Sequence, residues 1–175
     1  MSRFASRSAV LVGALSLVPA TAHAQGGSLA SATAVGVTVQ AIGTSDGWAE
    51  VPAIGLHLTT VRASGLGIDV TLGTVPSVLA SGVLLLAPDV GVAQLFPIAG
   101  GALMLKAGPS GIIVSGGDET AGVVGVHVGA VAFLRMGPRI GIRAEIVPRF
   151  YSFDGESVHL TTFGIGLTSL PERFR

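Results

Sequence analysis

The sequence is notable first for what it lacks. It contains no cysteine, so it can form no disulfide bond and offers no thiol for lipid attachment. Charged residues make up only 11% of the 175 residues, whereas a soluble domain averages about 25%. Lysine plus arginine and aspartate plus glutamate number ten each. Without a basic excess, nothing in the composition suggests a nucleic-acid partner.

Long apolar runs and aromatic residues are also scarce. After the first 24 residues no stretch reaches 18 consecutive apolar residues, so we expect no membrane-spanning helix. Aromatic residues are 5% of the chain, although 49% of it is hydrophobic. Such an apolar chain can still cross a membrane as a closed β-barrel, because strand pairing around the barrel satisfies every backbone polar group.

Residues 1–24, MSRFASRSAVLVGALSLVPATAHA, have the pattern of a secretory signal. Arg3 and Arg7 precede the apolar run 9–18, and the segment closes on the small-residue pattern AHA before Gln25. The apolar run is too short for a membrane anchor, which needs about 20 residues. We therefore expect a cleaved signal peptide at 1–24 and one secreted domain at 25–175.

Alternation of apolar and small or polar residues fills the rest of the chain. In GLGIDVTLG, residues 65–73, the side chains of Leu66, Ile68, Val70 and Leu72 would all point to one face of a strand. No helical periodicity competes with this pattern. The alternation predicts eight strands, at about 32–42, 51–62, 65–74, 83–94, 98–107, 121–135, 139–151 and 157–169.

The expected links between strands alternate in length. Short links are expected at 63–65, 95–97 and 136–138, and longer ones at 44–50, 75–81, 108–120 and 152–157. Acidic residues fall in or beside the longer links: Asp46, Glu50, Asp118, Glu119, Asp154 and Glu156. Short turns at one end and longer loops at the other are typical of outer-membrane barrels, whose longer loops face outside the cell.

Aromatic residues are expected at the two rims, where a barrel crosses the lipid interfaces. Trp48, Phe150, Tyr151 and Phe153 fall near the longer loops, and Phe96, Phe133 and Phe174 fall near the shorter turns. Along the expected strands one face is aliphatic, whereas the other carries mostly glycine, alanine and threonine with isolated charges. The small, polar face fits the narrow lumen of an eight-stranded barrel, so the aliphatic face would contact lipid.

With this architecture the chain resembles the small eight-stranded outer-membrane barrels of the OmpA/OmpX type. The segment 139–170, RIGIRAEIVPRFYSFDGESVHLTTFGIGLTSL, looks like the closing hairpin of such a barrel. The resemblance implies an all-β, antiparallel, up-and-down transmembrane barrel. One departure is the C-terminus: such barrels often end in an aromatic residue, but this chain ends LPERFR, with Phe174 one position short.

Ionisable residues on the small face are expected to fill the lumen. They are His57, Asp69, Asp89, Lys106, His127, Arg139, Arg143, Glu145 and Arg149. Charges in a narrow lumen are costly unless they are paired, and both signs are present, so we expect a network of ion pairs and hydrogen bonds. The simplest role of this network is to fill and rigidify the barrel. A gate or a proton-linked channel based on the histidines is the alternative.

Signals for other chemistry are weak. Ser157 and His159 share a face near Glu156, but no third group completes a catalytic set. The glycine-rich segment 108–117 lacks the spacing of a phosphate-binding loop. Three histidines on three separate strands show no metal-ligand spacing. We therefore expect no catalytic residues, no cofactor and no bound metal.

The sequence thus predicts an outer-membrane barrel with a structural or surface-interaction role. Its expected partners are outer-membrane lipid and lipopolysaccharide, with divalent cations bridging acidic loops to anionic headgroups. We expect a monomer and can name no surface ligand. Two alternatives remain at this point: a narrow channel or transporter, and a soluble periplasmic barrel whose aliphatic face points inward around an apolar ligand.

Overall fold

The computed structural model describes residues 31–44, 47–48, 52–153 and 155–171. These residues form nine strands and one short helix. The strands are β1 (Ala32–Thr44), β2 (Gly47–Trp48), β3 (Ala53–Val61), β4 (Leu66–Thr74), β5 (Val83–Ile98), β6 (Gly101–Gly116), β7 (Glu119–Arg135), β8 (Ile140–Phe153) and β9 (Glu156–Ser169). Helix α1 (Pro76–Leu79) has a proline in its first turn and links β4 to β5. No helix in the described ranges is long and apolar enough to cross a membrane.

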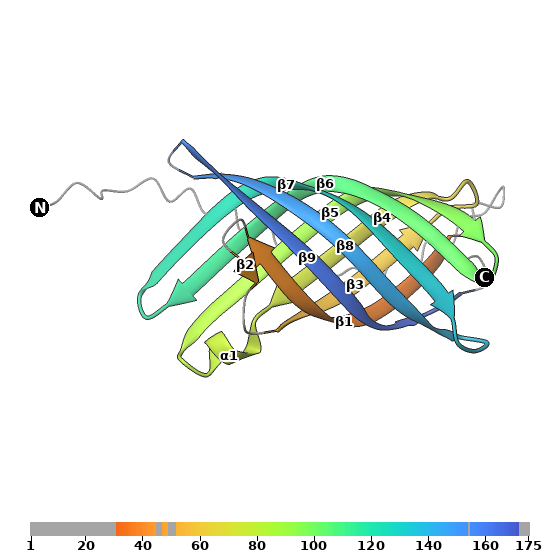
Figure 1. Ribbon diagram of the computed structural model, residues 1–175, viewed down its shortest axis with the longest axis horizontal. Helices are drawn as coiled ribbons and strands as arrows, with labels where there is room; N and C mark the ends of the chain where they lie inside the picture. The colour runs from red at the N-terminus through yellow and green to blue at the C-terminus, as the bar shows by residue number, and fades with distance from the viewer. Residues whose placement is uncertain (1–30, 45–46, 49–51, 154, 172–175) are drawn as a thin grey trace, which may run out of the picture.

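Eight of the strands close into one antiparallel barrel (Figure 1). Each strand pairs with the next along the chain, and β1 pairs with β9 to complete the circle, from Gly36 opposite Thr168 to Gly43 opposite Thr161. The short strand β2 is not part of the barrel wall and pairs only with the end of β1. The expected all-β, eight-stranded, up-and-down barrel is confirmed.

The two ends of the barrel differ. We call the end that carries α1 and the β6–β7 and β8–β9 turns the loop end, and the opposite end, with the β3–β4, β5–β6 and β7–β8 turns, the turn end (Figure 1). The strand limits correct three of the expected links. Most of residues 152–157 belong to strands, because β8 ends at Phe153 and β9 begins at Glu156. Residues 108–120 are mostly strand, because β6 and β7 run on to a tight turn at 117–118 in which Gly117 has a φ of 59°. Residues 95–97 belong to β5, and that turn lies instead at 99–100.

Side-chain exposure alternates along the strands and fixes the direction of each face. Val37, Leu56 and Ile165 are 44%, 56% and 62% exposed, and the same outward register holds for aliphatic residues on every barrel strand. A continuous aliphatic exterior is expected of a barrel surrounded by lipid rather than water. The soluble alternative, with an inward-facing aliphatic face, is therefore wrong for this fold.

A positive charge on this exterior should be poorly tolerated at mid-height. Leu56 lies near the centre of β3, opposite Val37 and Leu72. We expect Leu56→Arg to lower the free energy of unfolding by about 2–4 kcal/mol, the usual cost of arginine at the bilayer midplane. The measurement is urea unfolding of the protein refolded into lipid vesicles. Glu119→Arg at the exposed loop end serves as control, and equal effects of the two variants would contradict the assignment of the lipid face.

The interior at the turn end is a dry apolar core. We call it the turn-end plug; it consists of Ala32, Ala34, Val61, Ala93, Leu95, Ala102, Met104, Val131, Phe133 and Leu170. The side chains of Met104 and Phe133 are completely buried. The expected position of Phe133 in a rim girdle is wrong, because its place in the alternation turns it inward. Tyr151, also expected at a rim, is likewise buried inside.

Candidate functional site

The interior of the barrel above the plug holds two polar clusters. The lower cluster is centred on Asp69 and comprises Thr38, Gln40, His57, Thr59, Asp69, Thr71, Lys106, Arg143 and Glu145. The upper cluster is centred on Asp89 and comprises Asp89, Ser110, His127, Arg149, Tyr151 and Thr162. All of these side chains come from inward positions of the strands and are buried.

In the lower cluster, two cations share two carboxylates. The Nζ of Lys106 lies 2.6 Å from Oδ2 of Asp69, and Arg143 donates from Nη1 and Nη2 to the two oxygens of the same carboxylate at 3.2 and 3.3 Å. On its other side, Arg143 donates from Nε and Nη2 to Oε2 of Glu145, at 3.2 and 2.9 Å. Arg143 therefore bridges β4 and its own strand β8 across the lumen.

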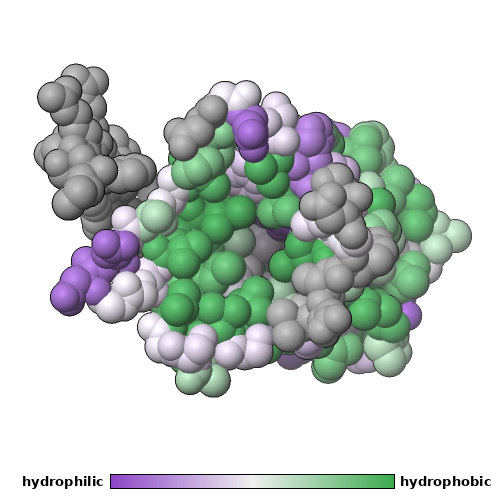
Figure 2. Space-filling model, turned by 60° about the vertical axis from the view of Figure 1, so that its left-hand side comes forward, coloured by the Kyte–Doolittle hydropathy of each residue, from purple (hydrophilic) through white to green (hydrophobic). Residues whose placement is uncertain are grey.

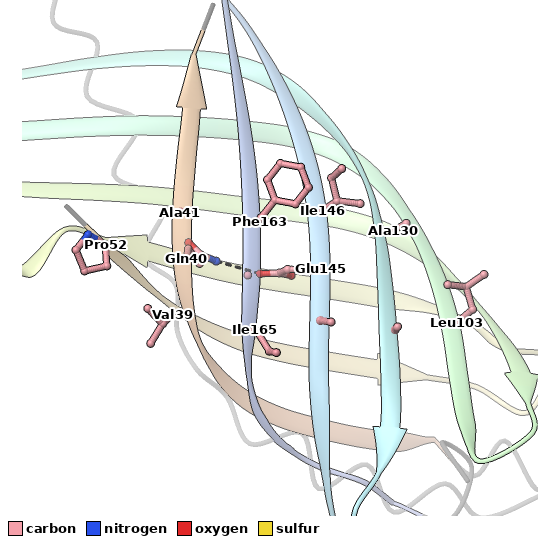
Figure 3. A pocket seen from close by; sticks show the side chains of 13 residues that line it. Val39, Gln40, Ala41, Pro52, Leu103, Ala130, Glu145, Ile146, Phe163 and Ile165 are labelled. Atoms are coloured by element: carbon pink, nitrogen blue, oxygen red, sulfur yellow. Dashed lines mark hydrogen bonds between the residues drawn. The ribbon is translucent and has the colours of Figure 1, made fainter. Parts of the chain in front are cut away.

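Neutral groups complete the coordination of both carboxylates. Thr59 and Thr71 donate to Asp69 from the neighbouring positions of β3 and β4. Gln40 donates from Nε2 to Oε1 of Glu145 at 3.0 Å. Figure 3 shows this last hydrogen bond, which reaches from β1 towards β8 past the intervening β9. Because buried charges are tolerated when fully paired and hydrogen-bonded, the cluster is a self-contained unit.

His57 links three strands through its two ring nitrogens. Its Nε2 lies 2.7 Å from Oγ1 of Thr38 on β1, and its Nδ1 lies 3.0 Å from Oγ1 of Thr71 on β4. The same Nε2 is 3.3 Å from Oε1 of Glu145. The histidine thus joins the β1, β3 and β4 wall to the carboxylate on β8.

The upper cluster is built around one ion pair. Arg149 donates from Nη2 to Oδ2 of Asp89 at 2.6 Å and from Nη1 to Thr162. Ser110 donates to the other oxygen of Asp89 and also lies 2.8 Å from the hydroxyl of Tyr151. His127 faces the same carboxylate at 4.0 Å, with its Nδ1 3.2 Å from the carbonyl oxygen of Pro109. Side chains from β6, β7 and β8 thus converge on Asp89.

Glycines at inward positions make room for these large side chains. A Cβ at Gly55 would lie 2.3 Å from Nε2 of Gln40, and one at Gly164 would lie 2.9 Å from Oε1 of Glu145. Both positions face charged or amide groups of the lower cluster. The missing side chains of these glycines thus leave the space that the large polar side chains of the lower cluster occupy.

Eight of the nine expected lumen residues lie in the interior, divided between the two clusters. Arg139 does not: it lies exposed in the turn between β7 and β8, at the turn end. Its expected inward position is wrong because β8 begins one residue later, at Ile140. Reasoning from the sequence also missed Gln40, Tyr151 and the lumen threonines. The alternation places these side chains inward, but an uncharged polar residue on the small face gives no signal of its hydrogen-bond partner, which lies on another strand.

The acidic residues expected in loops are only partly described. Asp118, Glu119 and Glu156 are exposed at the loop end, whereas Asp46, Glu50 and Asp154 lie outside the described residues. Ser157 and His159 are also exposed, and the His159 ring packs edge-on against Phe150 at 5.1 Å between centroids. No group of three or more potential metal ligands occurs within the described part of the chain.

A broad hollow of about 770 Å³ lies on the outward surface of β6 to β9 and β1. Its floor is formed by small side chains, including Ala130, Ala132 and Ala144, and larger ones such as Phe163 and Ile146 stand around it (Figure 3). Because it belongs to the aliphatic exterior, lipid acyl chains would cover it. Gln40 and Glu145 of the lower cluster also line it.

Comparison with known proteins identifies the fold. No protein-family model and no curated protein matches the sequence significantly. Among solved structures, the chain is similar to Neisserial surface protein A, with a TM-score of 0.58, 12% identity and coverage of 79% of this chain and 97% of that one. It is similar to the N-terminal β-barrel domain of Pseudomonas aeruginosa OprF, with a TM-score of 0.52, 12% identity and coverage of 77% and 96%. It is also similar to the outer-membrane protein OprG of Pseudomonas aeruginosa, with a TM-score of 0.51, 10% identity and coverage of 79% and 94%. The chain is therefore an eight-stranded β-barrel of the outer-membrane type.

Proposed function

We propose that this chain is a closed outer-membrane barrel with a structural or surface-interaction role, rather than a channel or an enzyme. The observation that carries the proposal is the double closure of its lumen. The turn-end plug contains completely buried Met104 and Phe133, and above it Arg143 spans the interior between Asp69 and Glu145. An eight-stranded lumen is just wide enough to be filled by side chains, so such an interior leaves no continuous path for ions.

Planar bilayer recordings test the closure. We expect the wild-type protein to give no single-channel steps above those of empty detergent, because an ion would have to displace both the plug and the ion pairs. Insertion is verified by heat-modifiable migration of protein recovered from matching vesicles. Two variants are recorded beside the wild-type protein. Met104→Ala removes part of the plug, and Leu103→Ala is its control, because it makes a similar truncation on the lipid face. Reproducible steps from the wild-type protein would contradict the proposal.

The role we assign to the loop end is contact with the cell surface. Asp118, Glu119 and Glu156 are exposed there, at the tips of β6 to β9. Carboxylates beside a membrane that carries anionic lipopolysaccharide would approach its headgroups through bridging divalent cations. We propose lipopolysaccharide and the surrounding lipid as the partners of a monomeric barrel, with no nucleic acid involved.

Binding to lipopolysaccharide vesicles separates this role from simple membrane residence. The protein in nanodiscs should bind such vesicles in the presence of Mg²⁺ and lose binding when the ion is chelated. The double variant Asp118→Asn, Glu119→Gln should bind more weakly than the wild-type protein, since it removes two cation-binding groups. The double variant Arg135→Gln, Arg139→Gln, changed at the opposite end, is the control. Mg²⁺-independent binding would contradict the bridging role.

A further inference from the structure

The mouth of the barrel at the loop end has an unusual lining. Its inward positions are aliphatic: Ile42, Val75, Leu85, Ala87, Ile112 and Leu160 surround a hollow of about 100 Å³ above the upper cluster. We call this the loop-end hollow. Figure 2 looks towards this end of the molecule and shows a depression with hydrophobic residues on its walls. The interior of the barrel is thus apolar at both ends and charged between them.

The two apolar ends are not equivalent. The side chains of the turn-end plug are all buried, whereas Leu85, Ile112 and Leu160 are each half-exposed around open space. Water in contact with apolar walls is unfavourable, and an apolar molecule that replaced it would remove that surface from water. The loop-end hollow has the form of a binding pocket that opens to the outside of the barrel.

The polar residues at the bottom of the hollow indicate which kind of ligand it can bind. Gln40, Arg149, Tyr151 and Thr162 lie there. Their polar atoms already have partners within the protein: Gln40 donates to Glu145, Arg149 to Asp89 and Thr162, and Tyr151 contacts Ser110. A charged ligand group would have to compete with these hydrogen bonds, and so the aliphatic walls provide the main recognition surface.

We propose that the loop-end hollow binds a small uncharged apolar molecule, such as one aromatic ring or a short alkyl group. The hollow of about 100 Å³ is smaller than the engineered apolar cavity of about 150 Å³ that binds benzene, so one ring is the largest group that it can hold. A ligand somewhat larger than the hollow can project through its open mouth. This assignment does not depend on whether the barrel conducts ions.

Methyl NMR in lipid nanodiscs tests the site with toluene as the probe. The methyl signals of Leu85, Ile112 and Leu160 should shift with toluene concentration and saturate together at one dissociation constant. The neighbouring outward residues Leu84 and Ile113 provide internal controls, because toluene that only partitions into lipid shifts their signals without saturation. Shifts of the inward methyl signals that rise with toluene concentration without saturating would overturn the proposal.

Paired tryptophan substitutions on one strand sharpen the test. Ile112→Trp should fill the hollow and raise the toluene concentration at half-saturation about tenfold or more, a loss of about 1.4 kcal/mol or more. Ile113→Trp, one residue away on the lipid face, should leave it unchanged. Should Ile112→Trp fail to show heat-modifiable migration, Leu85→Trp with Leu84→Trp provides a second pair on β5.

Unchanged toluene binding in the folded inward variant would overturn the proposal. So would nuclear Overhauser contacts between the inward methyls and lipid acyl chains before toluene is added, because lipid would then occupy the hollow.

Discussion

Replacement of Arg143 by methionine is expected to lower the free energy of unfolding by about 3–5 kcal/mol, the usual cost of breaking a buried ion pair by removing one partner. Methionine retains much of the apolar side-chain length but none of the charge. Asp69 and Glu145 would then share only Lys106, whose Nζ lies 2.6 Å from Asp69 but 3.8 Å from Glu145. Urea unfolding in lipid vesicles measures the change.

Two controls separate this effect from a general loss of charge. Arg139→Met removes an exposed arginine from the β7–β8 turn and should change stability little. The double variant Arg143→Met, Glu145→Gln should recover part of the loss, because the remaining Asp69–Lys106 pair is then balanced. A double variant no more stable than Arg143→Met alone would contradict the view that Glu145 is left unpaired.

Removal of the ring of Phe133 is the second large effect. Its side chain is completely buried in the turn-end plug, and the guanidinium carbon of Arg143 lies 5.5 Å from the centre of its ring. We expect Phe133→Ala to lower the free energy of unfolding by about 3–5 kcal/mol, because it leaves a cavity in a packed interior. The contact with Arg143 adds a cation–π contribution of about 0.5–2 kcal/mol.

The neighbouring residue provides the control for this cavity. Leu134 points outward into lipid, so Leu134→Ala opens no internal space and should cost less than Phe133→Ala. Phe133→Leu retains most of the volume without the aromatic ring. Its loss in the free energy of unfolding should fall between those of Leu134→Ala and Phe133→Ala. A double-mutant cycle of Phe133→Leu with Arg143→Met isolates the ring–guanidinium contact. A loss in Leu134→Ala as large as in Phe133→Ala would contradict the packing assigned to the plug.

Most of the fold could be predicted from the sequence because a barrel strand has a period of two. The alternation in 65–73 determines which side chains of β4 point to lipid, and Asp69 falls between two aliphatic outward residues. The ends of the strands could not be predicted as well. In 108–120, small and aliphatic residues continue into a strand, and only pairing with β7 shows that Gly117 rather than Gly108 makes the turn.

The candidate site was predictable in its members but not in its arrangement. Charged inward residues can be recognised one by one, yet their sorting into two clusters depends on height within the barrel, which follows from the register of all strands together. Thus Asp69 and Asp89 lie on the paired strands β4 and β5, but Arg143 contacts the first and Arg149 the second. The inward aliphatic residues at both ends could not be recognised from residue type, because aliphatic residues also form the lipid face and only depth in the barrel distinguishes the two.

The pairing of β1 with β9 has a consequence for how the chain reaches its native state. Every other barrel pairing joins neighbours in the sequence and can form as a local hairpin, whereas this seam joins residues more than 100 positions apart. Closing so long a loop is entropically costly, so the seam should form late, after the hairpins exist. Until β9 arrives, β1 is an open edge with unpaired backbone groups, and a nascent chain stalled at that stage would be prone to aggregate.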